Sequence, residues 1–224
     1  RERNQLYSIK SGEEELLAAP VRLNFWRALT DNDRGNRAGS RLGCWRDAGN
    51  APGIYNNTKF SIEGYKILEN GKKVIVTCGA VICTQPESKA TMIYTITSNG
   101  IEVDMQFRPD EALPEVPEVS MLFELPGDFE NVTYLGAGPF ENYIDRNNAA
   151  KIGLYSTTVD DMYTDYLKPQ ECGNRTGVRY ATLIGNKKTF TVVAEPVMEM
   201  NVSRYLPLEL EAAPHRKELP QSNK

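Results

Sequence analysis

Residues 135–179 read LGAGPFENYIDRNNAAKIGLYSTTVDDMYTDYLKPQECGNRTGVR. The stretch lies between runs with the apolar pattern of strands, yet glycines and prolines recur along it, so it cannot be one regular element. Its aromatic side chains alternate with acidic ones, a mixture too polar for a core strand and too aromatic for a solvated linker. We therefore expect a long ordered connection that is functional or packed against another part of the protein.

Composition places the chain among ordinary globular domains. With 224 residues, 40% of them hydrophobic, it can bury one good core, and we expect residues 1–224 to form a single domain. The net charge of -4 offers no basic surface for nucleic acid or for anionic lipid. No run approaches the roughly 18 apolar residues of a membrane-spanning helix. Neither nucleic acid nor a membrane is an expected partner.

Cysteine and histidine give no sign of a metal centre. Cys44, Cys78, Cys83 and Cys172 contain no C-x-x-C pair, and His215 is the only histidine. Zinc needs four such ligands at workable spacing, which these residues lack. We expect no metal site, and we expect the cysteines to be buried as small hydrophobic residues in a reducing compartment.

The first fifty residues give weaker signals. Alternation predicts a strand over residues 5–10 and another over residues 21–29. Residues 30–40 are charged and contain glycine, which predicts a loop, and residues 41–49 fit either a helical turn or an aromatic-bearing loop.

From residue 59 onward the β pattern is plain. Asn70-Gly71 is the strongest short hairpin signal, and alternating runs flank it. The expected elements are hairpins 59–68 with 73–77, 91–97 with 101–107 and 178–184 with 189–194, a strand at 119–125 with alternate side chains in the core, and a short helix at 206–213. Hairpins at this spacing predict an all-β fold, a large antiparallel sandwich.

Two blocks of the sequence form motifs that are too long to be explained as turns alone. They are Gly-x-Gly-Pro-x-Glu-Asn-Tyr-x-Asp-Arg at 136–146, continued by Asp161-Met162-Tyr163, Pro169-Gln170-Glu171 and residues 173–179, and Asn24-Phe25-Trp26-Arg27-Ala28 with Asp31-Asn32-Asp33-Arg34-Gly35. Together they resemble the C-terminal small-chain domain, domain 5, of bacterial β-galactosidases of glycoside hydrolase family 2. The resemblance covers nearly all of the chain. One departure is Cys172, where the family usually has Asn.

The resemblance implies a fold and an accessory role. The fold would be an antiparallel β-supersandwich of the galactose mutarotase type. The chain would wall the sugar site and pack on the catalytic barrel of the same polypeptide, which hydrolyses terminal β-D-galactosides with retention, as in lactose catabolism. The family's two catalytic glutamates lie in that barrel, so we expect no catalytic residue in this chain and no activity from it alone. It would be a fragment, cut short at the C-terminus and lacking the N-terminal barrel.

The resemblance also implies the setting of the parent enzyme. We expect a bacterial homo-oligomer in the cytoplasm or the periplasm. No cofactor is expected in this chain, and any Mg²⁺ or monovalent cation that the parent uses would lie outside it.

Residue roles follow from the matching motifs. Asp31, Asn32, Asp33, Arg34 and Gly35 resemble a mobile loop that borders the galactose pocket in the family, where Arg34 replaces a residue that is often apolar. The structural motif of the long connection comprises Gly136, Gly138, Pro139, Glu141, Asn142, Tyr143, Asp145, Arg146, Glu171, Gly173 and Arg179. Within it, Arg146 can pair with a carboxylate while Asn142 bonds the loop backbone.

Other interpretations of these residues stay open. Trp26 and Trp45 could stack on a sugar, although aromatic residues in a sandwich are also expected to pack in the core. A glycosidase needs two carboxyl groups, and the candidates nearest a motif are Asp31 with Asp33 and Glu141 with Asp145. Acidic residues in turns more often bond their own backbone.

Two other functions fit the same sequence. One is a stand-alone, non-catalytic carbohydrate-binding or assembly module, and the other is a mutarotase-like aldose epimerase. An epimerase needs a histidine and a glutamate at the sugar ring, and the only histidine, His215, lies near the end of the chain.

Overall fold

The computed structural model describes residues 4–49 and 58–220. These residues are mostly strands in antiparallel sheets, with few and short helices, which confirms the all-β prediction. The chain divides into two compact units. Unit 1 contains Arg1–Leu6, Val21–Arg27 and Asn32–Leu122, and unit 2 contains Tyr7–Pro20, Ala28–Asp31 and Phe123–Lys224. Residues 221–224, part of the end at which the sequence predicts a truncation, lie outside the described residues.

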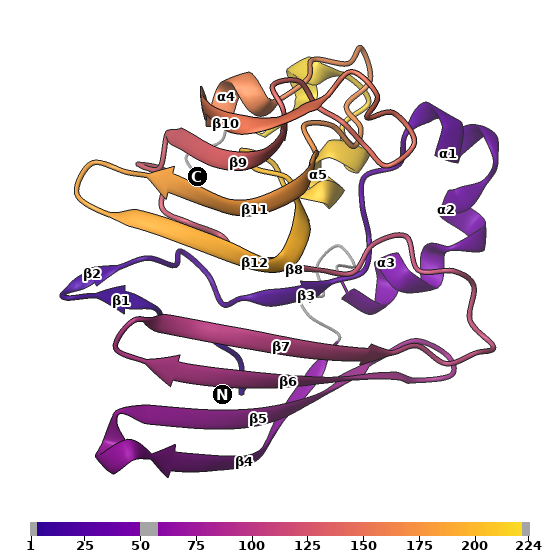
Figure 1. Ribbon diagram of the computed structural model, residues 1–224. Coiled ribbons are helices and arrows are strands. Elements are labelled where there is room, and N and C mark those ends of the chain that lie inside the picture. The colour runs from indigo at the N-terminus through magenta and orange to yellow at the C-terminus, as the bar shows by residue number, and fades with distance from the viewer. Residues whose placement is uncertain (1–3, 50–57, 221–224) are drawn as a thin grey trace. The chain divides into compact units, whose positions relative to one another are not determined.

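Unit 1 is built on a four-stranded antiparallel sheet with the order β4-β5-β6-β7 (Figure 1). Its strands are β4 (Lys59–Leu68), β5 (Lys73–Ile82), β6 (Ser88–Thr97) and β7 (Gly100–Arg108). Cys78, Met92 and Met105 are paired across three strands, and Cys78 and Met92 are buried. Because side chains alternate along each strand, this pairing gives the sheet one apolar face.

The first two hairpins confirm the sequence prediction. β4 pairs with β5 through the short 3-10 turn η1 (Glu69–Gly71), in which Asn70 has φ 54° and Gly71 has φ 88°. Asparagine and glycine tolerate this left-handed conformation better than other residues, which is why the dipeptide signal was informative.

An aromatic cluster occupies unit 1 beside its small second sheet, β3 (Arg22–Asn24) paired with β8 (Ser120–Leu122). Phe25 stacks on Phe107 with ring centroids 4.9 Å apart, and Trp45 meets Phe107 edge-on at 5.9 Å. The Trp45 indole donates to the carbonyl of Pro114 at 3.1 Å, so its polar atom is satisfied.

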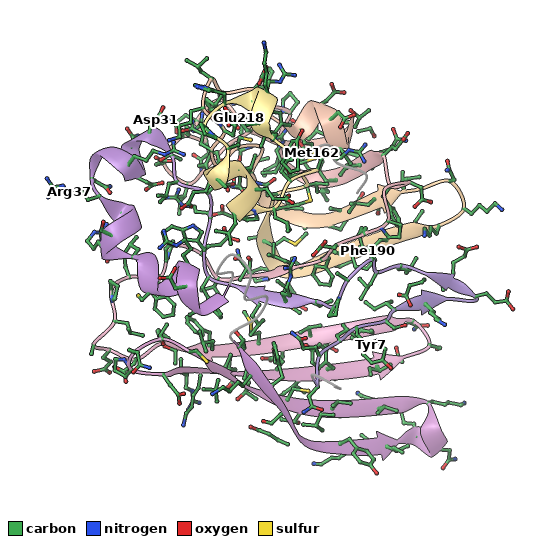
Figure 2. All side chains as sticks on the ribbon, turned by 180° about the vertical axis from the view of Figure 1, so that it is seen from behind. Tyr7, Asp31, Arg37, Met162, Phe190 and Glu218 are labelled. Atoms are coloured by element: carbon green, nitrogen blue, oxygen red, sulfur yellow. The ribbon has the colours of Figure 1, made fainter. Side chains whose placement is uncertain are left out.

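Residues 30–40, predicted to be a loop, instead contain helices. They are α1 (Asp31–Gly35) and α2 (Ala38–Arg41), and α3 (Gly43–Gly49) follows as one of the two alternatives for residues 41–49. Arg37 joins α1 to α2 in the left-handed conformation, with φ 60°, and its side chain points outward (Figure 2). Helices this short carry no apolar period, so the sequence had no signal for them.

The predicted strand at residues 5–10 is wrong except at its end. Only Lys10–Ser11 (β1) pairs, with Glu14–Glu15 (β2). The carboxylate of Glu15 accepts from the backbone N–H groups of Ile9 at 3.0 Å and Leu17 at 3.1 Å. A side chain therefore satisfies amides that a strand partner would otherwise bond.

Unit 2 contains a second four-stranded antiparallel sheet, with the order β10-β9-β11-β12 (Figure 1). Its strands are β9 (Asn131–Gly138), β10 (Lys151–Thr158), β11 (Arg175–Ile184) and β12 (Thr189–Met200). The helices of this unit are α4 (Val159–Met162), α5 (Pro207–Ala212) and the 3-10 turn η2 (Arg216–Glu218). The hairpin β11-β12 and the helix α5 confirm the predictions for those segments.

The core of unit 2 lies against one face of this sheet. Val132, Tyr134, Val178 and Ala181 are buried there, and Met162 of α4 packs among them (Figure 2). Met162 is 1% exposed and Val159 of the same helix is 4% exposed, so two side chains of α4 anchor it in this core.

The stretch 135–179 is more regular than predicted. It contains the end of β9, all of β10, and α4 before β11 begins. Gly136 and Gly153 are paired residues of neighbouring strands. A Cβ atom on Gly136 would lie 2.8 Å from Cγ2 of Val178, so this glycine permits close packing between β9 and β11. Glycine here marks a close approach, whereas the sequence prediction treated it as a turn signal.

Strand β8 is shorter than the predicted strand at 119–125. It covers Ser120–Leu122 only, and Val119 is 45% exposed, so Val119 does not enter the core. The pairing with β3 extends over three residues, and alternation cannot continue where no partner strand holds the backbone extended.

We predict that Gly136→Ala destabilises the fold. The new methyl group would overlap Val178, and overpacking of this kind costs about 1–3 kcal/mol in free energy of unfolding. Urea unfolding of the chain measures the effect. Gly64→Ala in β4 is the matched control, because a Cβ atom there meets no atom within 4 Å. Equal destabilisation by the two variants would contradict the close-packing interpretation.

Candidate functional site

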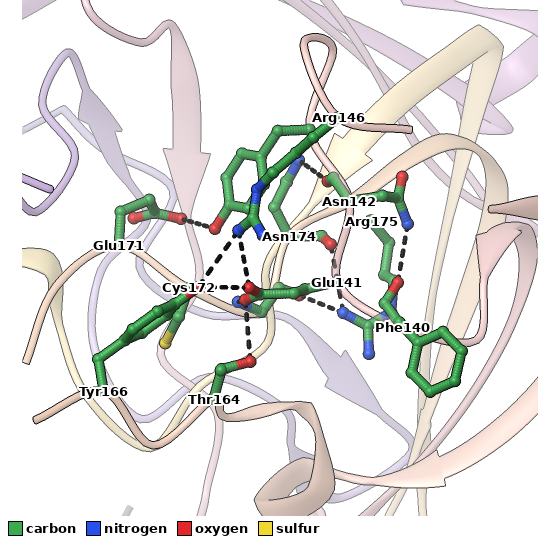
Figure 3. A network of polar contacts seen from close by, with 12 residues as sticks. Phe140, Glu141, Asn142, Arg146, Thr164, Tyr166, Glu171, Cys172, Asn174 and Arg175 are labelled. Atoms are coloured by element: carbon green, nitrogen blue, oxygen red, sulfur yellow. Dashed lines mark hydrogen bonds and ion pairs between the residues drawn. The ribbon is translucent and has the colours of Figure 1, made fainter. Parts of the chain in front are cut away.

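A single carboxylate organises the loop that follows β9. Glu141 accepts hydrogen bonds from the Gly173 backbone N–H at 2.8 Å, the Thr164 hydroxyl at 2.9 Å, the Tyr166 hydroxyl at 2.7 Å and the Arg146 guanidinium at 2.7 Å (Figure 3). Two donors reach each carboxylate oxygen, so both oxygens are occupied. The side chain of Glu141 is 11% exposed.

The environment decides the charge of Glu141. Burial would raise the pKa of this carboxyl group, but the hydrogen bonds from Gly173, Tyr166, Arg146 and Thr164 together lower it below its ordinary value. Glu141 is therefore ionised at neutral pH. The same pairing raises the pKa of the Arg146 guanidinium, so the ion pair stays charged over the physiological range.

Asn142 closes the same loop from the inside. It is 1% exposed, and its amide donates to the carbonyls of Ala137 at 3.1 Å and Phe140 at 2.9 Å. Its oxygen accepts from Thr176, from the backbone N–H at 3.0 Å and from the hydroxyl at 2.6 Å. One buried side chain thus satisfies the backbone where β9 ends and β11 begins.

Tyr143, between Asn142 and the exposed residues that follow, is packed on the network. The guanidinium of Arg146 lies 4.8 Å from the centre of its ring, and its hydroxyl donates to Glu171 at 3.5 Å. Burial, followed by the nearby charges of Glu171 and Glu141, raises its pKa, so the phenol stays neutral. Glu171 also accepts from Asn201 at 2.8 Å.

A buried arginine completes the network and was missed by the sequence analysis. Arg175 is 4% exposed and donates to the Tyr134 hydroxyl at 3.1 Å and to the carbonyls of Gly173 at 2.9 Å and Asn174 at 3.2 Å. Thr164, Tyr166 and Asn174 were missed as well. Residues of these types are common in loops, so the sequence gives no signal for them. Their role is visible only in the fold, which brings them to Glu141 and Asn142 from distant parts of the chain.

The remaining motif residues are distributed around this network. Gly138 allows close packing, because a Cβ atom there would lie 2.4 Å from the Tyr134 hydroxyl. Pro139 follows it through a cis peptide bond, and Gly173 has φ 81°. Asp145 is exposed, whereas Glu141 is largely buried.

The segment 31–35 forms α1, which begins in unit 2 and continues in unit 1. In unit 2, the backbone N–H of Asp31 donates to the side chain of Gln170 at 3.0 Å. In unit 1, Asp33 is 8% exposed and accepts two hydrogen bonds from Arg27, at 2.5 and 3.0 Å. Asn32 and Gly35 are exposed, and Arg34 is half-buried. Asp33 therefore anchors the helix.

Both tryptophans are buried. Trp26 and Trp45 are 0% exposed, and the Arg46 guanidinium lies 5.6 Å from the Trp26 ring centre. Stacking on a sugar needs an open ring face, which neither residue has in the described chain. Packing in the core, the other interpretation of these residues, accounts for both positions.

Metal chemistry finds no support among the residues that the structure describes. No group of three or more His, Cys, Asp or Glu side chains there could hold a metal ion. All four cysteines are free thiols, and burial raises the pKa of Cys172 to about 11, so it is protonated at neutral pH. None of the described helices is long and apolar enough to cross a membrane.

Comparison with known proteins gives the family. The family described as "Beta galactosidase small chain" matches residues 1–224. The chain belongs to the β-galactosidase small-chain family. This small-chain domain is 35% identical over 225 residues to a β-galactosidase of Priestia megaterium, in an alignment that covers 100% of the chain and 21% of that protein.

Two further relatives show the same relation. A β-galactosidase of Halalkalibacterium halodurans is 33% identical, with 96% of this chain and 21% of that protein covered. A β-galactosidase of Streptococcus thermophilus is 31% identical, with 100% of this chain and 21% of that protein covered. The small-chain domain thus spans about a fifth of the length of the relatives that it matches.

We predict that Glu141→Gln destabilises the loop at neutral pH. The amide has one acceptor oxygen where the carboxylate has two, so donors such as the Gly173 N–H lose their partner, at a cost of about 1–3 kcal/mol. Hydrogen exchange at Gly173 and urea unfolding measure the loss. Asp145→Asn, an exposed acid in the same motif, is the control and should be neutral.

The effect of Glu141→Gln should depend on pH. The native pKa of Glu141 lies below the value of about 4.3 in the unfolded chain. Its stabilisation is therefore present above that pH and is lost as pH falls through the native pKa. The stability difference between wild type and Glu141→Gln should shrink below about pH 4. A difference that is independent of pH would contradict this assignment of charge.

The burial of Trp26 and Trp45 predicts the fluorescence of the chain. Emission should be that of indoles shielded from water, and iodide should quench it little, because both rings are 0% exposed. Galactose should leave the spectrum unchanged if the rings only pack. Strong quenching by iodide, relieved by galactose, would instead support stacking on a sugar. Free tryptophan under the same conditions is the control.

Proposed function

We propose that this small-chain domain is an accessory part of a β-galactosidase and contains no catalytic residue of its own. The observation that carries the proposal is the state of Glu141, the most highly coordinated carboxylate of the long motif. Both of its oxygens are occupied by donors and its pKa is lowered. It has neither the proton nor the free lone pair that bond cleavage requires.

The chemistry of glycoside hydrolysis explains why this state matters. A retaining enzyme needs a general acid with a raised pKa and a second carboxylate about 5 Å away as nucleophile. Glu141 has the opposite shift, and Asp145 is exposed in the same loop. The carboxylate of Asp33 accepts two hydrogen bonds from Arg27. One carboxylate of each candidate pair, Glu141 or Asp33, is therefore occupied by structural partners, and the pair that cleaves the bond would lie elsewhere in the polypeptide.

The relatives support an accessory role for this chain and catalysis by another part of the polypeptide. Each is called a β-galactosidase and has about four fifths of its length outside the matched region. The proposed parent hydrolyses terminal β-D-galactosides with retention, and its catalytic barrel is the partner of this domain. Homo-oligomerisation of the parent, a bacterial cytoplasmic or periplasmic location and the use of Mg²⁺ and a monovalent cation outside this chain belong to the same proposal.

Within that enzyme, the small-chain domain would wall the sugar pocket through residues 31–35. Asp31 is held by its backbone and Asp33 by its side chain, each by neighbours in its own unit. Asn32 and Gly35 are left exposed and can face a ligand. A segment with fixed anchor points and exposed residues beside them is suited to shaping a pocket without taking part in the reaction.

The decisive measurement is hydrolysis of a chromogenic β-galactoside by this chain alone and by the intact polypeptide that carries it. We expect turnover only from the intact polypeptide, because the catalytic carboxyl pair is proposed to lie outside this chain. A calorimetric titration of the chain with galactose runs in parallel. Turnover by the chain alone would overturn the proposal, and tight binding of galactose without turnover would favour the stand-alone binding module.

A further inference from the structure

One face of the β9–β12 sheet is directed away from the core of unit 2. Leu154, Leu135, Tyr180 and Val193 are paired in one row across all four strands. Their neighbours Tyr134 and Ala181 point to the opposite face and are 1% exposed. Leu154 is 63% exposed and Val193 is 75% exposed, so the row ends in two large apolar side chains at the surface.

The next row on the same face has a different character. Ser156, Thr133, Thr182 and Thr191 are paired across the same four strands. Hydroxyl groups bond to one another between Thr133 and Ser156 at 3.1 Å and between Thr182 and Thr191 at 3.0 Å. A sheet face that is exposed to water usually has polar side chains, as in this hydroxyl row. The apolar row, two residues away on the same strands, does not fit such a face.

A hollow of about 620 Å³ lies beyond the other side of the apolar row. Its lining includes Ile144, Ile152 and Val197, which are 84%, 56% and 45% exposed. Ile152 precedes Leu154 by two residues on β10 and therefore shares its face. The apolar row and this lining form one surface, which we call the outer apolar face.

An arginine, Arg179, is among the residues that line the hollow. Gly177 has φ 60°, and the register of β11 shifts between Val178 and Tyr180, so the chain bulges where Arg179 stands. A Cβ atom on Gly177 would lie 3.4 Å from Ile152 and 3.5 Å from the Arg179 guanidinium, which places both beside this glycine. Arg179 donates to the carbonyl of Gly177, and within the described residues it forms no ion pair.

The exposed aliphatic side chains of the outer apolar face indicate a protein partner. Five exposed aliphatic side chains gather around the hollow and the row: Ile144, Ile152, Leu154, Val193 and Val197. Contiguous apolar surface is rare on a free domain and marks an interaction site. Among the described residues that line the hollow, none is aromatic, so they provide no flat stacking surface of the kind by which proteins usually hold a sugar ring.

The length of the relatives supports a partner within the same polypeptide. About four fifths of each β-galactosidase lies outside the region that this chain matches, within the same polypeptide. A covalently attached neighbour is present at high effective concentration, so a face of this modest size is enough to hold it. The interface then ends at the hydroxyl row, because those polar side chains can remain exposed to water.

We propose that the outer apolar face docks the catalytic portion of the same polypeptide. That portion inserts an aliphatic or aromatic side chain into the hollow and presents a carboxylate or carbonyl oxygen to Arg179. The inference rests on the proposed accessory function, since it takes its partner from it, and it adds the face and the residues by which the small-chain domain is held.

The test is chemical labelling of two single variants of the intact polypeptide. Leu154→Cys lies on the apolar row and Ser156→Cys lies on the hydroxyl row of the same strand and face, so the second is the matched control. Leu154 is 63% exposed in this chain, so its replacement removes little core packing. Reaction with a maleimide is followed by mass spectrometry of the peptide that contains residues 151–158.

We expect the cysteine at position 154 to react at least tenfold more slowly than the one at position 156 in the intact polypeptide, and at a similar rate in the isolated chain. Equal rates in the intact polypeptide would overturn the inference. Protection that disappears on dilution would also overturn the inference, because the face would then be covered by a second copy of the polypeptide. Hydrolysis of a chromogenic β-galactoside by the same samples keeps the two proposals apart. If the intact polypeptide hydrolyses the galactoside while the cysteine at position 154 reacts freely, only the proposal of the docking face is refuted.

Discussion

The structure of unit 2 depends on the ionised carboxylate of Glu141. Four donors from residues 146, 164, 166 and 173 reach its two oxygens, and the farthest of them lies 32 residues along the chain. Charge-assisted hydrogen bonds are stronger than neutral ones, and here they outweigh the desolvation of the carboxylate. The chain between β9 and β11 can therefore be irregular in part and still have one conformation.

Asn142 and Gly136 extend this order to the sheet. Asn142 satisfies the backbone at the end of β9 and the start of β11, and Gly136 lets those strands approach closely through Val178. The carboxylate of Glu141, with two donors on each oxygen, has no lone pair or proton left for chemistry. The same contacts hold Glu141 rigidly and occupy its oxygens, and both properties suit the proposed role of a domain that frames a site formed elsewhere.

The hairpins were predictable because their signals are local. Alternation along β4 to β7, the Asn70-Gly71 turn and the β11-β12 pair depend on neighbouring residues, which the sequence displays directly. The helices α1 and α2 and the strand β10 were not predicted. They are held by contacts such as Asp33 with Arg27 and Gly153 opposite Gly136, and glycine and aspartate are ordinarily read as turn residues. For the candidate site, the motif from Gly136 to Arg146 was visible, whereas Arg175 and Tyr166 had no local signal.

By itself, the sequence determined the all-β class, the hairpin turns and the kinship with the β-galactosidase small chain, because turn chemistry, alternation and long motifs are written in consecutive residues. Only the tertiary structure decided which donors surround Glu141, that both tryptophans are buried, and that one sheet face is divided into an apolar row and a hydroxyl row. These properties depend on strand register and on the meeting of distant segments. Burial and pairing across such distances set the charge and exposure of each group, and no local pattern encodes them.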